Sequence, residues 1–333
     1  MALKKSIGKK TLLMLTINAV LGTGIYFLPA IAARYSGSAS ILSWIIISLF
    51  AILTSFYFAE LVSMFPKSGG AYEFVKNAFG MQAAFVFGWM AWIISNLTIS
   101  MLIVGSIIYL LPNAGVLESL ALAVGFILLF NFISYRGIGL ASRMLLFFGI
   151  MTVASLVILI IPGMMTADIS KFTNVFAAPP ILILLSVYFI AETFFGLETT
   201  TYLTEEVKDA RKVMPKMLII ANVIITVLAC LTVFVALGNV DASTFAAQEA
   251  PLAFLAETFF GHQMGQIFVL IIFIPLIGTA ASWIVSSPRL LFAMARDKIL
   301  VQRFARIHKK YRTPYVAIAF QTAVTIILTI LAF

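Results

Sequence analysis

The sequence predicts an all-α polytopic membrane protein, and three observations predict it. The chain has 333 residues, of which 62% are hydrophobic and only 11% charged, and its mean hydropathy is +1.10. A soluble domain of this length cannot bury so much apolar surface, so lipid must surround much of the chain. The apolar residues form runs of about 20, the length that crosses a hydrocarbon core of about 30 Å as a helix. The period-2 alternation typical of membrane strands is absent.

Nine apolar runs are long enough to span the bilayer as helices. They occupy residues 11–34, 41–65, 82–111, 116–134, 143–163, 180–203, 217–238, 265–294 and 314–333. Pro66 and a glycine pair follow the second run, and residues 71–80 then form an amphipathic stretch that predicts an interfacial helix. Residues 204–216 form a charged connector, and residues 239–262 form an acidic loop.

The distribution of positive charge predicts the orientation of the chain. If the N-terminus is cytoplasmic and the chain changes side at each span, all but Arg34 and Lys171 of the 22 Lys and Arg residues are cytoplasmic. This asymmetry follows the positive-inside rule, so no nucleic-acid partner is needed to explain the net charge of +9. The basic run at residues 303–312 is interpreted as a topogenic loop near lipid headgroups. The first run lacks a clear cleavage site, which indicates an uncleaved helix, and the single cysteine, Cys230, supports no disulfide.

Two spans contain breaks at corresponding positions. The first is interrupted at Gly22, Thr23 and Gly24 in the stretch AVLGTGIYFLP, and the sixth is interrupted around Gly196 in ETFFGLE. A single glycine in a span is typical of close helix packing. Two breaks five spans apart instead favour a binding site, because broken helices at membrane depth persist only inside protein or beside a wet cavity. We therefore expect both breaks to contribute to one site.

Four motifs resemble those of the amino acid–polyamine–organocation superfamily of transporters, and the resemblance to that superfamily covers essentially the whole chain. They are GTGIYFLP in the first span, AELVSMFPKSGGAYEFVKNAFG (59–80), FFGLETTTYLTEEVKDARKVMPK (194–216) and PRLLFAMARDKILVQRFARIHKKYRTP (288–314). The resemblance implies a five-plus-five inverted-repeat fold with discontinuous helices one and six. The first repeat would occupy residues 1–163 and the second, incomplete at about helix nine, residues 164–333. Within the superfamily the motifs are most similar to arginine/agmatine-type and related basic amino acid or polyamine antiporters.

The resemblance also implies a substrate site at the two breaks. N–H groups of the first break would meet a substrate carboxylate, and carbonyls of both breaks would meet its α-ammonium, as the partial charges of helix ends favour. Asn96 and Trp283 fall on substrate-contacting positions of the family, although an interhelical hydrogen bond is the alternative for Asn96 and plain packing for Trp283. The predicted substrate-binding residues are Ala19, Gly22, Thr23, Gly24, Asn96, Ala191, Glu192, Phe194, Gly196 and Trp283.

Glu192 stands where the family has a gating aromatic residue. An ionisable group inside a span costs about 2.5–3.5 kcal/mol on insertion scales, so it normally faces a cavity or a partner. Glu192 therefore either pairs with a cationic substrate or carries a proton, and a protonated carboxyl bonded to a neighbouring threonine is the alternative. Glu198 matches a glutamate linked in relatives to pH-dependent exchange, and Thr152 takes the place of a lysine found in proton-coupled relatives. Coupling or gating is assigned to Glu192, Glu198 and Thr152.

The sequence thus predicts secondary active transport of amino acids or related amines by alternating access, in a multi-pass protein of the plasma membrane with a cytoplasmic N-terminus. It shows no nucleophile–base pair, phosphate loop or metal-ligand spacing, so no enzyme, metal site or cofactor is expected. The alternative is a non-transporting sensor, or half of a split transporter that needs a partner chain. Expected partners are the substrate, the lipid bilayer and a coupling proton or counter-substrate. A homodimer, and a second chain that supplies the remaining helices, are left open.

Overall fold

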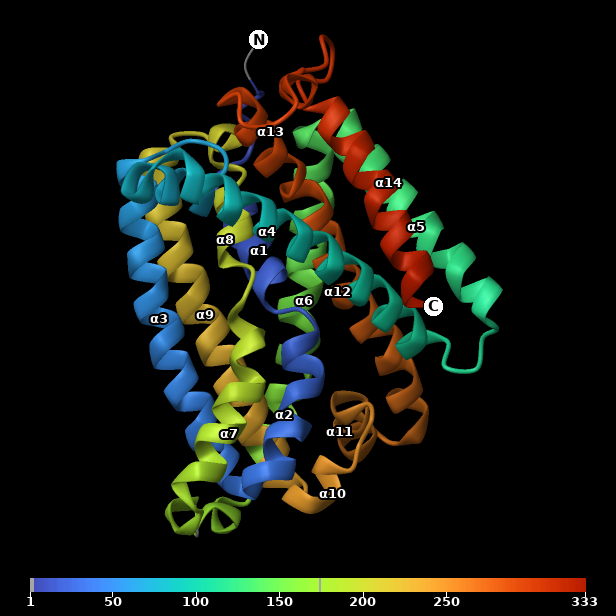
Figure 1. Ribbon diagram of the computed structural model, residues 1–333. Coiled ribbons are helices and arrows are strands. Elements are labelled where there is room, and N and C mark those ends of the chain that lie inside the picture. Colours follow the sequence, from blue (N-terminus) through green and yellow to red (C-terminus); the bar gives the residue numbers. More distant parts are fainter. Residues whose placement is uncertain (1–2, 174) are drawn as a thin grey trace.

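The structure is a computed structural model that describes residues 3–173 and 175–333, and Figure 1 shows its helical architecture. Apart from one isolated bridge between Ile7 and Val207, the regular structure in these residues is helical, which confirms the all-α prediction. The α-helices are α1 (Lys9–Val20), α2 (Thr23–Ser36), α3 (Ser40–Met64), α4 (Ala71–Leu110), α5 (Val116–Arg136), α6 (Ile138–Thr166), α7 (Pro180–Ile190), α8 (Leu197–Thr201), α9 (Ala210–Asn239), α10 (Ala242–Ala246), α11 (Pro251–Phe260), α12 (His262–Ser286), α13 (Pro288–Arg296) and α14 (Tyr315–Ala332). Short 3-10 helices are η1 (Gly37–Ala39), η2 (Ile169–Phe172), η3 (Val175–Ala177), η4 (Ala191–Phe194), η5 (Thr204–Glu206) and η6 (Gln302–Ala305).

Eight helical stretches within the described residues are long and apolar enough to cross a membrane. One of them, Lys9–Met64, contains α1, α2 and α3 and therefore both of the first two predicted spans. The other seven stretches correspond one to one with the remaining seven predicted spans. The difference between nine and eight arises because the turn after α2 is itself a 3-10 helix, so the chain reverses direction between α2 and α3 without a non-helical interruption. A multi-pass helical membrane protein is thus confirmed.

The helices form one bundle with α1, α6 and α12 in contact at its centre. In Figure 1, α3 and α9 run side by side on one flank, α5 and α14 lie together on the other, and α4 crosses obliquely between them. The α4 helix has two segments, because Gly80 takes a φ of 83° and kinks the axis there. The helix expected over residues 71–80 is the first of these segments, and its interfacial position stays a prediction.

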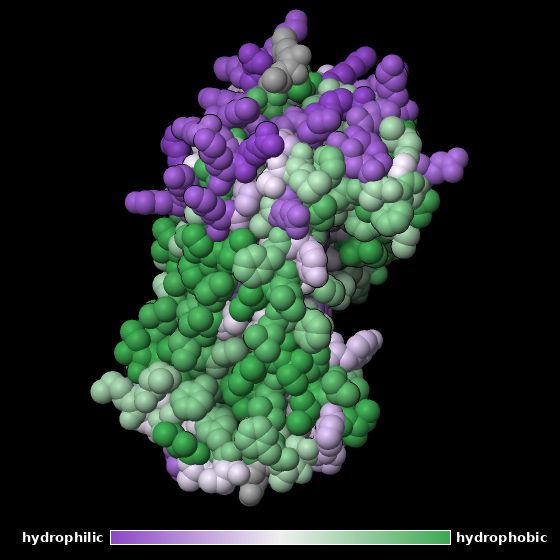
Figure 2. All heavy atoms as spheres, turned by 90° about the vertical axis from the view of Figure 1, so that its left-hand side faces the viewer, coloured by the Kyte–Doolittle hydropathy of each residue, from purple (hydrophilic) through white to green (hydrophobic). Residues whose placement is uncertain are grey.

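The surface divides into an apolar band and a polar end. Figure 2 shows hydrophobic side chains around the middle of the molecule and hydrophilic ones gathered where the N-terminus lies. On α3, which faces the viewer, Leu49, Phe50 and Tyr57 are all more than half exposed. Such a surface suits hydrocarbon rather than water. The polar end carries residues 3–10, 204–212 and 289–312, and is called the basic end below.

The basic end is joined by buried polar contacts. The backbone carbonyl of Glu206 accepts hydrogen bonds from the N–H groups of Ser6 and Ile7 at 2.9 and 3.0 Å, and the Lys208 N–H donates to the Ile7 carbonyl at 3.0 Å. The Glu206 carboxylate pairs with Arg289 of α13 at 2.9 Å, and both side chains are fully buried. The N-terminal segment, the connector before α9 and α13 therefore form one block.

Candidate functional site

The first span breaks at the predicted position. The α1 helix ends at Val20 and α2 begins at Thr23, because Leu21 (ψ 68°) and Gly22 (ψ −139°) leave the helical conformation. The first N–H groups of a helix have no acceptor within that helix. Those at the start of α2 therefore face the break, together with the partial positive charge of the helix N-terminus. This arrangement favours a negatively charged ligand group.

The sixth predicted span breaks as well. Ala191 begins η4, which follows α7 directly and leads to an extended Phe195 before α8. Gly196 lies between them with a φ of 118°, a left-handed conformation that favours glycine. The Glu198 carboxylate accepts the Gly196 N–H at 3.0 Å and so satisfies one donor at the start of α8. The break therefore depends on a glycine and on an acidic side chain two residues later.

The two breaks touch each other through glycines. A Cβ atom on Gly24 would lie 2.6 Å from the Cα atom of Thr193 in η4. A Cβ atom on Gly196 would overlap the carbonyl oxygen of Ala19, in the last turn of α1. Side chains at these positions would force the backbones apart. The glycines thus allow segments that are far apart in the sequence to meet.

A cavity of about 110 Å³ lies where the breaks meet. Its walls come from α1 and α2, α4, the η4–α8 segment and α12. The lining residues are Ala19, Val20, Gly22, Thr23, Gly24, Ile94, Thr98, Leu102, Glu192, Phe195, Glu198, Thr279 and Trp283. The structure thus brings together seven residues predicted for substrate binding or coupling: Ala19, Gly22, Thr23, Gly24, Glu192, Glu198 and Trp283.

Asn18 fixes the end of α1 against two neighbouring helices. Its amide nitrogen donates to the Gly278 carbonyl and to the Ser282 hydroxyl, both at 2.7 Å. Its amide oxygen accepts from the Thr152 hydroxyl of α6 at 2.9 Å. The backbone carbonyl of Asn18 accepts from the Thr279 hydroxyl, also at 2.9 Å. Thr152 was predicted to take part in coupling. It does not line the cavity but orients Asn18, whose neighbour Ala19 does.

Trp283 connects the cavity wall to the first break. Its indole N–H donates to the Ala19 carbonyl at 3.2 Å, and the side chain is almost fully buried while it lines the cavity. The carbonyl of Ala19 is one of those that the end of α1 leaves without an intrahelical partner. Trp283 thus satisfies this group and forms apolar wall at the same time.

Two predicted residues lie elsewhere in the bundle. Asn96 is fully buried on the side of α4 that faces α14, where it donates to the Trp92 carbonyl and accepts from the Thr325 hydroxyl, both at 2.8 Å. This is the interhelical bond named as the alternative, and a substrate contact for Asn96 stays a prediction. Phe194 packs against Trp44 of α3, with ring centroids 6.4 Å apart.

Sequence reasoning assigned Asn96 of α4 to the site and missed the α4 residues that line the cavity. Ile94, Thr98 and Leu102 line it, and their spacing of four places them on one face of the helix. Thr98 is the polar residue on that face. The helical spacing of four residues between Ile94, Thr98 and Leu102 is the sequence signal that could have identified it. Phe195 and Thr279 were also missed, although both stand inside the motifs around the sixth and eighth predicted spans.

The cavity offers complementary groups for a small zwitterion. Backbone donors lie at the start of α2, and the carboxyl groups of Glu192 and Glu198 supply hydrogen-bond acceptors. The Glu192 side chain lines this cavity and is exposed. Among the residues that the structure describes, no group of three or more His, Cys, Asp and Glu is placed to hold a metal ion.

Comparison with known proteins gives the family. The model of a family described as amino acid permease matches residues 7–333. The chain is 25% identical to the branched-chain amino acid permease of Bacillus subtilis (strain 168), over 95% of this chain and 72% of that protein. It is 25% identical to the serine/threonine exchanger of the same organism, over 99% and 77% of the two chains. It is 26% identical to the large neutral amino acids transporter small subunit 2 of Homo sapiens, over 99% of this chain and 65% of that protein.

These matches confirm the predicted amino acid–polyamine–organocation superfamily, whereas the closer likeness to arginine/agmatine antiporters stays a prediction. The relatives named above are permeases, exchangers and transporters, not enzymes. The match to the family extends over almost the whole chain. The multi-pass helical bundle and its paired helix breaks are consistent with this family. The chain belongs to the amino acid permease family of membrane transporters.

Proposed function

We propose that the protein moves amino acids across the plasma membrane by alternating access, with the substrate held in the cavity between the two breaks. The observation that carries this proposal is that both breaks line one cavity, although their residues are far apart in the sequence. Discontinuous helices that present backbone groups at mid-membrane are the usual transporter solution for binding a charged small molecule without a metal.

The substrate carboxylate would bind the N–H groups at the start of α2, around Thr23 and Gly24. The N-terminal partial charge of α2 favours an anion there, and Gly24 has no side chain to obstruct it. The α-ammonium would bind carbonyls near the end of α1 and of η4, where helix C-termini carry partial negative charge. Trp283 of α12 and Leu102 of α4 would contact the apolar part of the substrate.

Glu192 would then determine which side chains are accepted. It lines the cavity, is exposed, and makes no ion pair among the described residues. It would pair with a cationic side chain such as that of arginine, or carry a proton when the substrate is neutral. The names of the relatives above refer to branched-chain, serine/threonine and large neutral substrates. A carboxylate in this position would thus extend recognition toward basic amino acids.

Coupling would depend on Glu192 and Glu198 rather than on α6. Thr152 has a hydroxyl that does not titrate in the physiological range, and its bond to Asn18 is structural in kind. Any coupling proton would therefore bind one of the two cavity carboxylates. Exchange of one amino acid against another would need no coupling proton on Glu192 or Glu198.

Access would alternate when the segments that meet at the basic end separate from one another. In this structure Glu205 joins three segments there, because its carboxylate binds Arg296 of α13 at 2.6 Å and the backbone N–H of Ser68 at 3.1 Å. The positive charge at this end supports a cytoplasmic location, as the positive-inside rule favours. The repeats, residues 1–163 and 164–333, would each contribute one break and move relative to each other.

The test is uptake of radiolabelled leucine, serine and arginine into liposomes that contain the purified full chain and an internal pool of unlabelled amino acids. Glu192→Gln is compared with Glu118→Gln, which makes the same change on an exposed residue at the start of α5. A charge-assisted bond contributes about 1.5–3 kcal/mol, so Glu192→Gln should lower the apparent affinity for arginine about tenfold to a hundredfold. Leucine affinity should change less than threefold, and Glu118→Gln should behave as wild type.

Three outcomes separate the parts of the proposal. Absence of uptake of any amino acid by the wild-type protein would contradict amino acid transport itself. Transport with equal arginine affinity in Glu192→Gln and wild type would leave transport standing and refute cation recognition by Glu192. Loss of proton-gradient-driven uptake with intact exchange would assign the proton to Glu192 instead.

A further inference from the structure

The segment between α13 and α14 concentrates positive charge that the transport cavity does not use. No acidic residue occurs after Asp297, whereas residues 303–312 contain five cationic side chains and one histidine. These residues are Arg303, Arg306, His308, Lys309, Lys310 and Arg312. The stretch of residues 303–312, here called the basic turn, lies at the basic end of the bundle, far from the cavity at the helix breaks.

The basic turn has a defined shape. The His308 N–H donates to the Thr313 carbonyl at 2.9 Å, and the Arg312 N–H donates to the His308 carbonyl at 3.0 Å. The ring Nδ1 atom of His308 accepts from the backbone N–H groups of Lys310 and Tyr311, both at 3.2 Å. Because Nδ1 accepts two bonds, the neutral ring carries its proton on Nε2, which remains available as a donor. The turn is thus held in place before any ligand binds.

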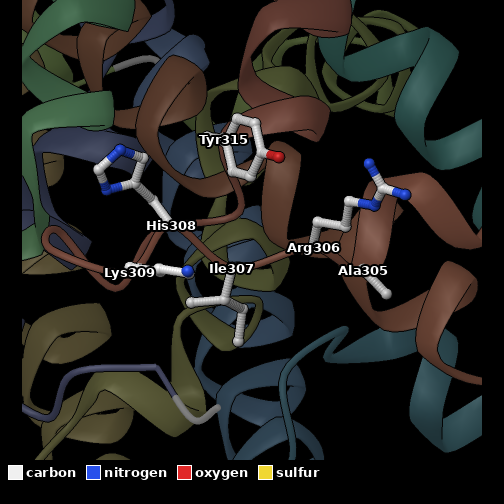
Figure 3. Close-up of a pocket in the computed structure, with 6 residues that line it drawn as sticks. All are labelled: Ala305, Arg306, Ile307, His308, Lys309 and Tyr315. Atoms are coloured by element: carbon white, nitrogen blue, oxygen red, sulfur yellow. The ribbon is translucent and has the colours of Figure 1, made fainter.

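A cavity opens beside this turn. Its volume is about 440 Å³, and its lining residues are Ala305, Arg306, Ile307, His308, Lys309 and Tyr315. Figure 3 shows the Arg306 guanidinium and the Lys309 ammonium on opposite sides of Ile307, with the Tyr315 hydroxyl turned toward the Arg306 side. Arg306 and Lys309 are exposed, and neither forms an ion pair with any described residue. Their charge is therefore free to bind an anion.

The position of the turn corresponds to the border of the lipid-facing surface. Tyr315 begins α14, which is a membrane-spanning helix. The Thr313 hydroxyl donates to the Tyr135 carbonyl at 3.0 Å and ties the turn to the last residues of α5. There the Arg136 guanidinium lies 5.6 Å from the centre of the Phe132 ring, and Phe132 is 55% exposed. Cations and apolar surface are thus one helical turn apart, as they are at a headgroup layer.

We propose that the basic turn binds the phosphate of an anionic phospholipid. Arg306 and Lys309 would bind the phosphate oxygens, the His308 Nε2–H and the Tyr315 hydroxyl would donate to them, and the exposed surface of α5 around Phe132 would contact the acyl chains. A soluble phosphate would use the same cations but would gain nothing from the adjoining apolar surface. Each Lys or Arg near an anionic membrane surface contributes roughly a fivefold gain in affinity.

The test measures lipid binding by the purified full chain in neutral detergent micelles, by isothermal titration. The probes are short-chain phosphatidylglycerol, the matching phosphatidylcholine, and inorganic phosphate. The variant Arg306→Gln/Lys309→Gln removes two charges of the cavity. The matched control Lys4→Gln/Lys5→Gln removes two exposed charges from the same end of the molecule but outside the turn. Circular dichroism confirms that both variants are folded.

We expect phosphatidylglycerol to bind in preference to phosphatidylcholine, with about thirtyfold weaker binding in Arg306→Gln/Lys309→Gln and less than threefold weaker binding in the control. Equal binding of the two lipids by the wild-type chain would overturn the proposal. An equal loss in both double variants would also overturn it, because the effect would then be general surface charge. Inorganic phosphate that binds as tightly as phosphatidylglycerol and displaces it would assign the cavity to a soluble phosphate instead.

Discussion

Gly22 gives the sharpest test of how the first break is fitted to α12. An added Cβ atom at this position would lie 2.9 Å from the Cγ2 methyl of Thr279, whereas carbon atoms in ordinary contact are about 3.5–4.0 Å apart. Thr279 cannot turn its methyl away freely. Its hydroxyl donates to the Asn18 carbonyl at 2.9 Å and contacts the Pro275 carbonyl at 3.1 Å, so rotation would break both contacts.

Both responses to Gly22→Ala give a similar magnitude. Displacement of α2 from α12 costs about 1–3 kcal/mol, as overpacked cores do. Rotation of Thr279 breaks the hydrogen bond that its single hydroxyl proton makes and leaves the buried Asn18 carbonyl without that donor, at about 1–3 kcal/mol. We therefore expect Gly22→Ala to lower the free energy of unfolding by about 1–3 kcal/mol and to weaken amino acid binding.

Thr279→Ser supplies the compensating change. It removes the clashing methyl and keeps the hydroxyl, and the next nearest Thr279 atoms would lie 3.6 Å from the new Cβ atom, which is ordinary contact. Thr279→Ser alone should cost about 1 kcal/mol for one buried methyl. The double variant should be more stable than Gly22→Ala, with a favourable coupling of about 1–2 kcal/mol.

The assay is reversible unfolding of the four proteins in mixed detergent micelles, combined with equilibrium binding of a radiolabelled amino acid. Gly105→Ala in α4 is the control, because nothing lies within 4 Å of an added Cβ atom there. The control should not lose stability, since alanine is the better helix former. Simple addition of the two single losses in Gly22→Ala/Thr279→Ser would refute the reasoning, because the methyl contact would then not be what requires glycine.

Two further predictions concern the basic end and the second break. Glu206→Gln should lower the free energy of unfolding by about 3–5 kcal/mol, because it leaves Arg289 buried without a counter-charge. The control Asp241→Asn breaks an exposed ion pair with Lys171 at 3.0 Å and should lower it by less than about 1 kcal/mol. Thermal unfolding of both variants checks this, and equal losses would contradict it. Gly196→Ala should cost about 2–5 kcal/mol from left-handed strain and overpacking, whereas Gly125→Ala, which has open space around it, should cost nothing. A Gly196→Ala protein with wild-type stability and uptake would show that the second break does not need glycine.

The positions of the spans could be predicted from the sequence because hydrophobic length is a local property. Every predicted span corresponds to an observed helical stretch, and only the merger of the first two differs. Both breaks could be predicted for the same reason, since Gly22 and Gly196 interrupt their spans in the sequence itself. Some helices extend further than predicted, as at Ile138–Thr166, where the helix continues beyond both ends of the predicted run at 143–163.

The partners of the breaks could not be predicted from the residues, because they depend on how distant helices pack. In the sequence Asn18 is a single polar residue in an apolar run, yet its side chain forms hydrogen bonds with both α6 and α12. Asn96 stands in a similar run and faces α14. Nothing in the local sequence distinguishes these two asparagines. Family resemblance favoured Asn96 for substrate contact, whereas in this conformation Thr98, two residues later, lines the cavity.

The central claim is that an amino acid binds in the cavity between the two helix breaks. The chain has one cysteine, so Cys230→Ser provides a background in which a single new cysteine can be labelled. Thr98→Cys in this background places a thiol in the cavity wall, and Ser243→Cys places one on the exposed α10 helix as control.

The decisive measurement is the rate of alkylation of each thiol by a small water-soluble reagent in proteoliposomes, with and without a transported amino acid. The account predicts that saturating amino acid slows labelling of Thr98→Cys at least tenfold and leaves Ser243→Cys unchanged. Equal rates for Thr98→Cys with and without an amino acid that the same protein demonstrably transports would contradict the placement of the substrate in this cavity.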